Sequence, residues 1–548
     1  MIKYFVLTIL SAISLVSISA QTTLSGRVRN AVTGEYILGA NVIIENNTSG
    51  VSTNLYGFYS LSIPEGEHSI RYSFIGFKSL TVKVNMSGSK VKDVDLAPQT
   101  VEIMGANIIG AKGENTNSTE LGSTVVSIET IKSLPALFGE VDVLKVIQLL
   151  PGIQSSGEGN TGFYVRGGGP DQNLILLDNA AVYNASHLFG FFSVFNADAI
   201  SNVGVHKGTM PARYGGRISS VLDISLREGN RREHKVNGGV GLISARLTVE
   251  GPIKKDTSSF IFCARRTYID VLTRPFAKGT SAEGSGYYFY DLNAKINHRF
   301  SEKDEVYLSG YFGRDVFSFK STDAGFGTDI PWGNAIASLR WNHLFNDQLF
   351  LNMNVSYTDY NFAFEGEQEE FAFGFNSGIE DWSYKSTMNY YPNSRHEIKG
   401  GVEYVFHQFM PTDFFARNGD TPIEFGVSEV TYSHESSAFI ESDFEVNEFL
   451  KIYSGLRYSD FRHVGPFTRY SSDYTVMDST VFGKGELVKK YGGFEPRISA
   501  RIKTGTYSSI KAGFSENYQY VHLASLSAST APTDVWLPSS DLVKPQWG

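Results

Sequence analysis

Cysteine is almost absent from this sequence: Cys263 is the only one in 548 residues. A disulfide within the chain and a metal cluster of several cysteines are therefore excluded. Its position between Phe262 and Ala264 predicts a small buried strand residue rather than a reactive thiol. Charged residues are also scarce, at 19%, against roughly 25% in average soluble proteins. The formal net charge of −9 argues against nucleic-acid binding, which usually needs a basic patch.

Long apolar runs are missing everywhere except at the N-terminus. There Lys3 precedes an apolar run over residues 4–18, and small residues lead to Ala20 and Gln21. This order predicts a secretory signal peptide over residues 1–20, cleaved after Ala20. The run is too short to span a bilayer comfortably, since about 20 residues are needed. We therefore expect an exported protein without a membrane helix.

Aromatic residues and glycine are abundant, with 29 Tyr, 39 Phe and 54 Gly. Tyrosine and phenylalanine without long apolar runs are typical of β-rich proteins with interfacial aromatic residues. The length predicts several domains.

Residues 21–98 show short alternating segments separated by turn residues, which predicts a small β-sandwich. The expected strands are Thr23–Arg29, Asn41–Ile44, Gly57–Ile63, His68–Phe74 and Ser79–Val84. The segments at 25–28, 57–61 and 75–77 (SGRV, GFYSL and IGF) resemble the carboxypeptidase regulatory-like domain. That resemblance implies no peptidase activity.

Residues 150–229 hold the most specific pattern in the chain. A helix-like run, Val141–Leu150, stops at Pro151; FYVRGG follows at 163–168, and the strand Leu174–Leu177 ends in Asp178. VHKG at 205–208 then leads to ARYGGR at 212–217. This order resembles the plug domain of TonB-dependent outer-membrane receptors, so we assign residues 121–229 to a plug.

The resemblance implies that the charges of Arg166, Asp178, Arg213 and Arg217 help to hold the plug against a barrel wall. The whole set of plug-motif residues comprises Arg166, Gly167, Asp178, Lys207, Gly208, Arg213, Tyr214, Gly215 and Arg217. Solvated loop charges are the alternative. The family usually has Gly after the aspartate, where this chain has Asn179; asparagine tolerates the left-handed backbone that a turn requires.

Residues 99–120 form a polar linker with one apolar island. By resemblance this island is the TonB box, an extended segment that pairs as a strand with TonB. It comprises Val101, Glu102, Ile103, Met104, Gly105, Ala106, Asn107, Ile108 and Ile109. The alternative is a last strand of the sandwich.

Residues 235–548 alternate strongly between apolar and polar positions. In the segment 349–358, Leu349, Leu351 and Met353 share one face with Val355, whereas Asn352 lies on the other. Strands of about ten residues with this alternation are the signature of a membrane barrel. We expect short turns at 346–347 and 503–505, and long outer loops at 321–333, 361–381, 410–431 and 463–495.

The number of strands poses a problem, because we find about 12 after residue 235 and plugged transporters have 22. An open sheet edge in lipid leaves backbone groups unpaired. We therefore expect a fragment that holds the N-terminal part of the barrel; the rival is a smaller complete barrel. The predicted fold class is mainly β, with an N-terminal β-sandwich, an α+β plug and an antiparallel transmembrane β-barrel.

Catalytic and metal-binding patterns are not found, so we predict no enzyme, no cofactor and no metal site. His396-Glu397 and His434-Glu435 begin like a zinc-protease motif, but Gly400 and Ala438 stand where the second histidine belongs.

The resemblance implies an outer-membrane receptor with a periplasmic N-terminal domain that takes up a scarce nutrient. The ligand is a ferric siderophore, cobalamin, a glycan or a peptide. The implied partners are the TonB–ExbB–ExbD complex, outer-membrane lipid and, for a glycan importer, a SusD-like lipoprotein. A receptor that signals or adheres without transport is the alternative.

Overall fold

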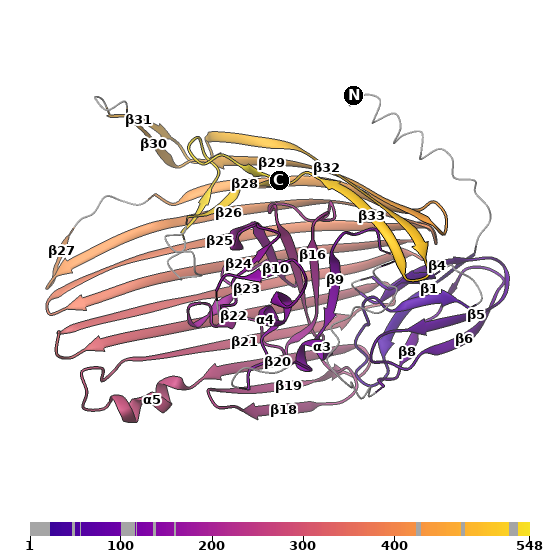
Figure 1. The fold of residues 1–548 in the computed structure, drawn as a ribbon, viewed down its shortest axis with the longest axis horizontal. Helices are drawn as coiled ribbons and strands as arrows, with labels where there is room; N and C mark the ends of the chain where they lie inside the picture. The colour runs from indigo at the N-terminus through magenta and orange to yellow at the C-terminus, as the bar shows by residue number, and fades with distance from the viewer. Residues whose placement is uncertain are drawn as a thin grey trace.

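The computed structural model describes residues 22–548 except 46–49, 55, 100–115, 117, 135–138, 158–159, 424–428, 473–476 and 525–534. Figure 1 shows three parts. Long strands lie side by side across the molecule, the predicted plug region lies in front of their middle, and the N-terminal domain lies at their right-hand end. The predicted signal peptide lies outside the described residues.

The N-terminal domain is a sandwich of two small sheets, with strands close to those predicted. Its strands are β1 (Thr22–Asn30), β2 (Asn41–Ile44), β3 (Gly50–Ser52), β4 (Phe58–Ile63), β5 (Gly66–Ser73), β6 (Leu80–Met86), β7 (Lys90–Val91) and β8 (Val94–Leu96). One sheet has the order β3-β2-β5-β6; the other joins β4, β1 and β7, with β8 also on β1. Alternate residues such as Leu24, Val42 and Leu61 fill the core between the sheets. The sequence pattern missed β3, β7 and β8, which are too short to show a period of two.

The predicted plug region is built on a five-stranded sheet in the order β13-β12-β17-β16-β9. Its strands and helices are β9 (Ser123–Ser127), α3 (Ile128–Lys132), α4 (Val143–Gln148), β10 (Ile153–Ser155), β11 (Phe163–Val165), β12 (Asn173–Leu177), β13 (Ala180–Ala181), β14 (Ser186–His187), β15 (Phe192–Ser193), β16 (Ile200–Lys207) and β17 (Ser220–Leu226). The predicted helix corresponds to α4, which begins after Asp142, whose carboxylate accepts the Lys145 N–H. Val143, Val146 and Ile147 lie on its buried face.

The third part is a single large antiparallel sheet, which we call the wall sheet. Its first strands are β18 (Lys235–Val240), β19 (Ser244–Lys254), β20 (Ser258–Thr267), β21 (Gly286–Arg299), β22 (Asp304–Ser321), β23 (Phe326–Asn346) and β24 (Leu349–Gln368). It continues through β25 (Phe371–Asn393), β26 (His396–Asn418), β28 (Thr431–Glu445), β29 (Leu450–Val464), β32 (Leu487–Gly505) and β33 (Ser508–Ser515), with β27 (Thr421–Ile423) on β26. Neighbours pair in sequence order, and β18 and β33 stand at the two ends of the order.

The wall sheet buries its polar face and exposes its apolar face. On β24, Asn352 and Asn354 are 8% and 2% exposed, whereas Val355 is 41% exposed. On β23, Ser338 is buried and Leu339 is 48% exposed. This inverts the pattern of a water-soluble domain, and it matches a strand with lipid outside and a polar interior. The alternation predicted from the sequence is therefore present, with its polar side toward the plug region.

In all four long outer loops predicted from the sequence, most residues lie in strands. Residues 361–381 continue β24 and β25, which turn only at Glu369 and Glu370. Residues 326–333 belong to β23, and 410–418 belong to β26. The segment 463–495 holds a separate hairpin of β30 (Phe467–Ser472) and β31 (Met477–Phe482) before β32. Strands pair beyond the alternating segment because backbone hydrogen bonds do not require apolar side chains.

A short helix, α5 (Ile269–Ala277), connects β20 to β21. Near the C-terminus, β34 (Tyr518–Gln519) pairs with β37 (Gln546–Trp547), and β35 (Val521–Ala524) pairs with β36 (Val535–Pro538). Among the described helices, none is both long enough and apolar enough to cross a membrane.

Candidate functional site: the seat of the plug region on the wall sheet

The plug region touches the polar face of the wall sheet through buried ion pairs, and Asp178 forms one of them. Its Oδ2 lies 2.8 Å from Nζ of Lys295 on β21, and its Oδ1 accepts the Leu226 N–H at 3.0 Å. Both side chains are 5% exposed or less. Burial by itself raises the pKa of Asp178, but the positive charges of Lys295 and Arg340 outweigh it, so the pKa lies below its usual value. The carboxylate therefore stays charged in its seat.

The turn that carries Asp178 has an unusual backbone. Asp178 has φ +47° and Asn179 has φ +69°. Both lie in the left-handed region, which asparagine and aspartate tolerate better than other side chains. Asn179 thus supplies the conformation for which the family uses glycine.

Arg213 makes a second bridge to the wall. Its Nη1 lies 2.6 Å from Oε1 of Glu441 on β28, and its N–H donates to Oε2 of the same carboxylate at 3.1 Å. Glu120 lies 3.6 Å away on the plug side, and Nζ of Lys385 donates to the Arg213 carbonyl at 2.6 Å. One arginine therefore joins the plug region to β25 and β28.

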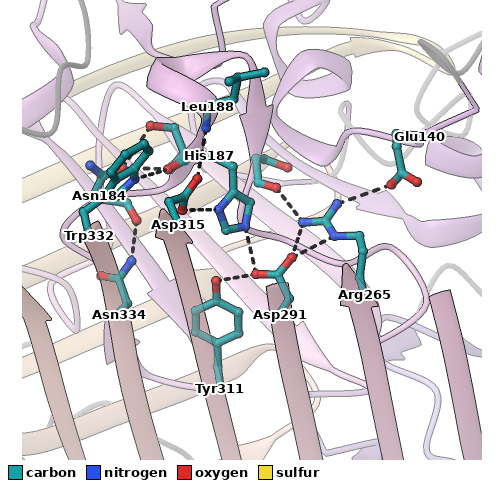
Figure 2. Close-up of polar contacts among 12 residues, drawn as sticks. Glu140, Asn184, His187, Leu188, Arg265, Asp291, Tyr311, Asp315, Trp332 and Asn334 are labelled. Atoms are coloured by element: carbon teal, nitrogen blue, oxygen red, sulfur yellow. Dashed lines mark hydrogen bonds and ion pairs between the residues drawn. The ribbon is translucent and has the colours of Figure 1, made fainter. Parts of the chain in front are cut away.

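The most extensive network centres on His187 and is shown in Figure 2. Nε2 of His187 lies 2.8 Å from Oδ1 of Asp291 on β21, and Nδ1 lies 2.6 Å from Oδ2 of Asp315 on β22. The ring stacks on Phe289 with 4.0 Å between centroids. Asp291 also binds Arg265 at 2.6 Å. The imidazole is thus held between two wall carboxylates and an aromatic ring.

The same network fixes a strained turn. Leu188 and Phe189 have φ +48° and +52°, which costs of order 1–3 kcal/mol for each such residue. The Leu188 N–H donates to the Tyr287 hydroxyl at 2.7 Å and to Asp315 at 3.1 Å. These wall contacts stabilise the turn.

The charge of His187 predicts a pH dependence of the seat. Burial lowers its pKa, but Asp291 and Asp315 outweigh burial and raise the pKa from 6.5 to about 9. The stabilisation is therefore complete below pH 6.5 and is lost as the pH rises through 9; a difference of this size is on the order of 3 kcal/mol. We expect the free energy of plug unfolding in detergent to fall by this amount between pH 6.5 and 10.

The matched variant is His187→Gln, which keeps hydrogen bonding but cannot titrate. We expect the free energy of plug unfolding of this variant to be lower at pH 6.5 and to change much less between pH 6.5 and 10. Parallel pH profiles for the variant and the unmodified protein would show that His187 does not carry the charge.

The remaining predicted plug residues form turns, make contacts within the plug region or leave room for a side chain of the wall. Gly167 and Gly208 have φ +90° and +104°, and Nζ of Lys207 donates to the Pro151 carbonyl at 2.7 Å. A Cβ on Gly215 would lie 2.3 Å from Nε of Arg457, so the wall arginine approaches because no side chain is there. Tyr214 donates to Asp223 at 2.7 Å.

Two of the predicted charges do not pair as expected. Arg166 is exposed, and within the described residues it makes no ion pair; its guanidinium lies beside Gly122 and Gly208 instead. Arg217 is buried, donates to the Gly216 carbonyl at 2.8 Å and lies over the ring of Trp536 at 5.4 Å. Arg166 stands in an exposed turn with a left-handed backbone, φ +50°, which corresponds to the alternative of a solvated loop charge.

The candidate TonB box, Val101–Ile109, lies outside the described residues. No group of three or more His, Cys, Asp or Glu side chains in the described part of the chain is arranged to hold a metal ion.

The sequence interpretation missed His187 and both of its partners. Asp291 and Lys295 both lie on the polar face of β21. Charged residues at polar-face positions of a strand were therefore a usable signal for the wall side of the seat. The pairing of these carboxylates with His187 could not be predicted, because the two partners lie 104 and 128 residues away along the chain.

Comparison with known protein families identifies two of the three parts. Residues 97–221 match the family model of the TonB-dependent Receptor Plug Domain. The plug region is a TonB-dependent receptor plug domain. Residues 24–108 match the CarboxypepD_reg-like domain, as the sequence motifs indicated.

Two curated relatives of the chain are TonB-dependent receptors by description. It is 28% identical over 237 residues to the TonB-dependent receptor SusC of Bacteroides thetaiotaomicron, which is 40% of this chain and 22% of that protein. It is 23% identical over 223 residues to the probable TonB-dependent siderophore receptor PirA of Acinetobacter baumannii, which is 34% of this chain and 29% of that protein. The matches thus span less than a third of either relative.

Solved structures share the fold of the plug domain and wall sheet. The siderophore receptor PirA of Acinetobacter baumannii superposes with a TM-score of 0.52 at 17% identity, covering 75% of this chain and 63% of that one. The copper transporter OprC gives 0.53 at 11% identity, covering 73% and 65%. The wall sheet therefore has the fold of the barrel wall of these proteins.

Proposed function

We propose that this chain belongs to a TonB-dependent outer-membrane receptor that actively imports a scarce nutrient. The observation that carries the proposal is the seat of the plug domain. Buried ion pairs join the plug to the polar face of a sheet whose other face is apolar and exposed. An apolar exterior suits lipid, and a plugged polar interior suits regulated passage.

The chemistry of the seat favours a plug that is held in a defined position and still released. Buried ion pairs contribute little net stability, because desolvation offsets much of their attraction, but they define a geometry. Water that enters the seat solvates the separated charges of Asp178 and Lys295, which lowers the cost of moving the plug. A purely apolar seat offers no such compensation.

The energy for that movement comes, in this proposal, from the TonB–ExbB–ExbD complex acting on Val101–Ile109. An apolar extended segment pairs with a partner strand through backbone hydrogen bonds. The segment precedes the plug domain directly, so a pull on it is transmitted to β9. The predicted signal peptide and the apolar outer face of the wall sheet support a location in the outer membrane, with the N-terminal domain in the periplasm.

The nutrient is a ferric siderophore, cobalamin, a glycan or a peptide. The relative described as a siderophore receptor supports the first of these, and the relative SusC is a TonB-dependent receptor as well. A SusD-like lipoprotein is a partner if the nutrient is a glycan.

Deletion of Val101–Ile109 tests the proposal. Growth of the source bacterium is compared on ferric desferrioxamine, cyanocobalamin, maltoheptaose or hexaalanine as the limiting nutrient. We expect growth to fail on one of them, with unchanged protein in the outer membrane. The control is Lys112→Arg, which lies in the linker outside the segment and should grow normally. Normal growth of the deletion strain on all four would contradict TonB-driven import through this segment.

A further inference from the structure

One sheet of the N-terminal domain is buried on both faces. Every residue of β4 is buried, and so are Thr22–Val28 of β1. Leu24 and Leu61 point into the domain's own core. Their neighbours Ser25 and Ser60, which pair across the two strands, are 0% and 4% exposed. A small domain standing free in water would expose this second face.

The second face is covered by the turn between β23 and β24. Oγ of Ser25 donates to Oδ1 of Asp347 at 2.9 Å. The rings of Tyr56 and Phe58 stack on Phe350 with centroids 5.2 and 5.8 Å apart. Phe350 is 1% exposed, although it is only the second residue of its strand.

A second contact clasps the segment that connects the plug domain to the wall sheet. The Glu35 carboxylate accepts the N–H groups of Glu228 and Gly229 at 3.0 and 3.1 Å. The Arg231 guanidinium lies 4.8 Å from the centre of the Tyr36 ring, and Arg232 pairs with Asp95 at 2.6 Å. The domain is thus joined to the plug–wall connection as well as to the wall.

These contacts place the domain across one end of the plug. Tyr36 and Tyr56 line a cavity of about 40 Å³ together with plug residues that include Asp178 and the wall residue Arg340. Such a volume holds little more than one or two waters. The same side carries the short connections of the wall sheet, at 347–348 and 394–395, and Figure 1 shows the domain at that end of the long strands. Material that passes the plug toward this end meets the N-terminal domain.

We propose that the N-terminal domain is a docked exit cap, which has to separate from the Asp347–Phe350 turn before a nutrient leaves the barrel. The inference rests on the proposed transport function. Its contact with the wall combines a hydrogen bond at Ser25 with ring stacking at Phe58, and such contacts can separate and form again. Because the cap also holds residues 228–232, a movement of the plug is transmitted to it directly.

A reversible cross-link tests the cap. Ser25→Cys with Asp347→Cys is introduced in a Cys263→Ser background and is oxidised, or bridged with a short bis-maleimide. We expect efficient cross-linking and a loss of at least about tenfold in the uptake rate of whichever of the four nutrient probes the protein imports, because closure then blocks a required conformational step. Reduction of the disulfide restores uptake. The proposal of an exit cap is overturned if the cross-linked protein takes up nutrient at the normal rate, or if neither reagent forms the cross-link.

The matched control is Asn41→Cys with Ser52→Cys, a directly opposed pair on β2 and β3 within the same domain. It cross-links without tethering the domain to the wall, so uptake is retained.

If the unmodified protein imports none of the probes, the transport proposal fails and a second measurement decides the cap. Ser25→Cys in the Cys263→Ser background is labelled with a maleimide that reaches the periplasm, in cells with and without TonB. Labelling that rises about fivefold or more with TonB supports a cap that opens, since label reports the open population. Equal labelling in both strains overturns it.

Discussion

Replacing Asp291 with asparagine is expected to lower the free energy of unfolding of the plug domain by about 3–5 kcal/mol, the usual cost of breaking a buried ion pair from one side. Asp291 is 0% exposed and lies within 2.8 Å of His187 and 2.6 Å of Arg265. It also accepts the Tyr311 hydroxyl at 2.8 Å. The substitution keeps the shape of the side chain but leaves the Arg265 guanidinium without its nearest negative charge.

Guanidinium titration in detergent, followed by protease sensitivity of the plug domain, measures this change. The matched control is Asp329→Asn on β23, where the carboxylate is exposed; a surface substitution of this kind stays within about 0.5 kcal/mol. A loss below about 1 kcal/mol for Asp291→Asn would mean that Glu140, 3.5 Å from Arg265, takes over the pairing and that the network is redundant.

A double substitution at Asp178 and Lys295 is expected to cost much less than the sum of its parts. Each single change, Asp178→Asn or Lys295→Met, leaves one buried charge unpaired and costs about 3–5 kcal/mol. The double variant removes both charges and leaves two neutral side chains of similar size. Asparagine also tolerates the left-handed backbone at position 178, so strain does not add to the result.

The coupling energy from this cycle is expected to be about 2–3 kcal/mol, near the upper end for contacting residues. Thermal unfolding of the four proteins under one detergent condition supplies it. If the two single costs simply add, the pair contributes no direct interaction, and the position of Asp178 is then set by its bonds to the backbone of β17.

The strands of the wall were predictable because their alternation is local. Residues 349–358 show it on their own, and the structure places Asn352 and Asn354 on the buried face. The lengths of the strands were not predictable in the same way. Glu365 and Glu367 interrupt the apolar pattern and indicated a loop, yet β24 continues to Gln368, since the backbone hydrogen bonds of a hairpin do not require apolar side chains.

The plug was partly predictable from its motifs. Asp178, Arg213 and Gly215 lie at the seat, and they could be singled out because turns and strand ends mark them in the sequence. The seat of His187 was not predictable, because it depends on which strands of a distant sheet stand opposite its loop. The N-terminal domain shows the same limit: its strands followed from alternation, but its docked face did not, because Ser25 and Ser60 resemble ordinary surface residues.

The single cysteine of the chain gives the molecule a built-in reporter. Cys263 lies on β20 at 0% exposure and packs into the same core as plug residues such as Val203 and Val205. The plug covers it from the interior side, so a thiol reagent in water reaches it only after the plug has left that part of the wall. In the protein without substitutions, the rate at which a thiol reagent reacts with Cys263 therefore reports the displacement of the plug. No further cysteine has to be introduced.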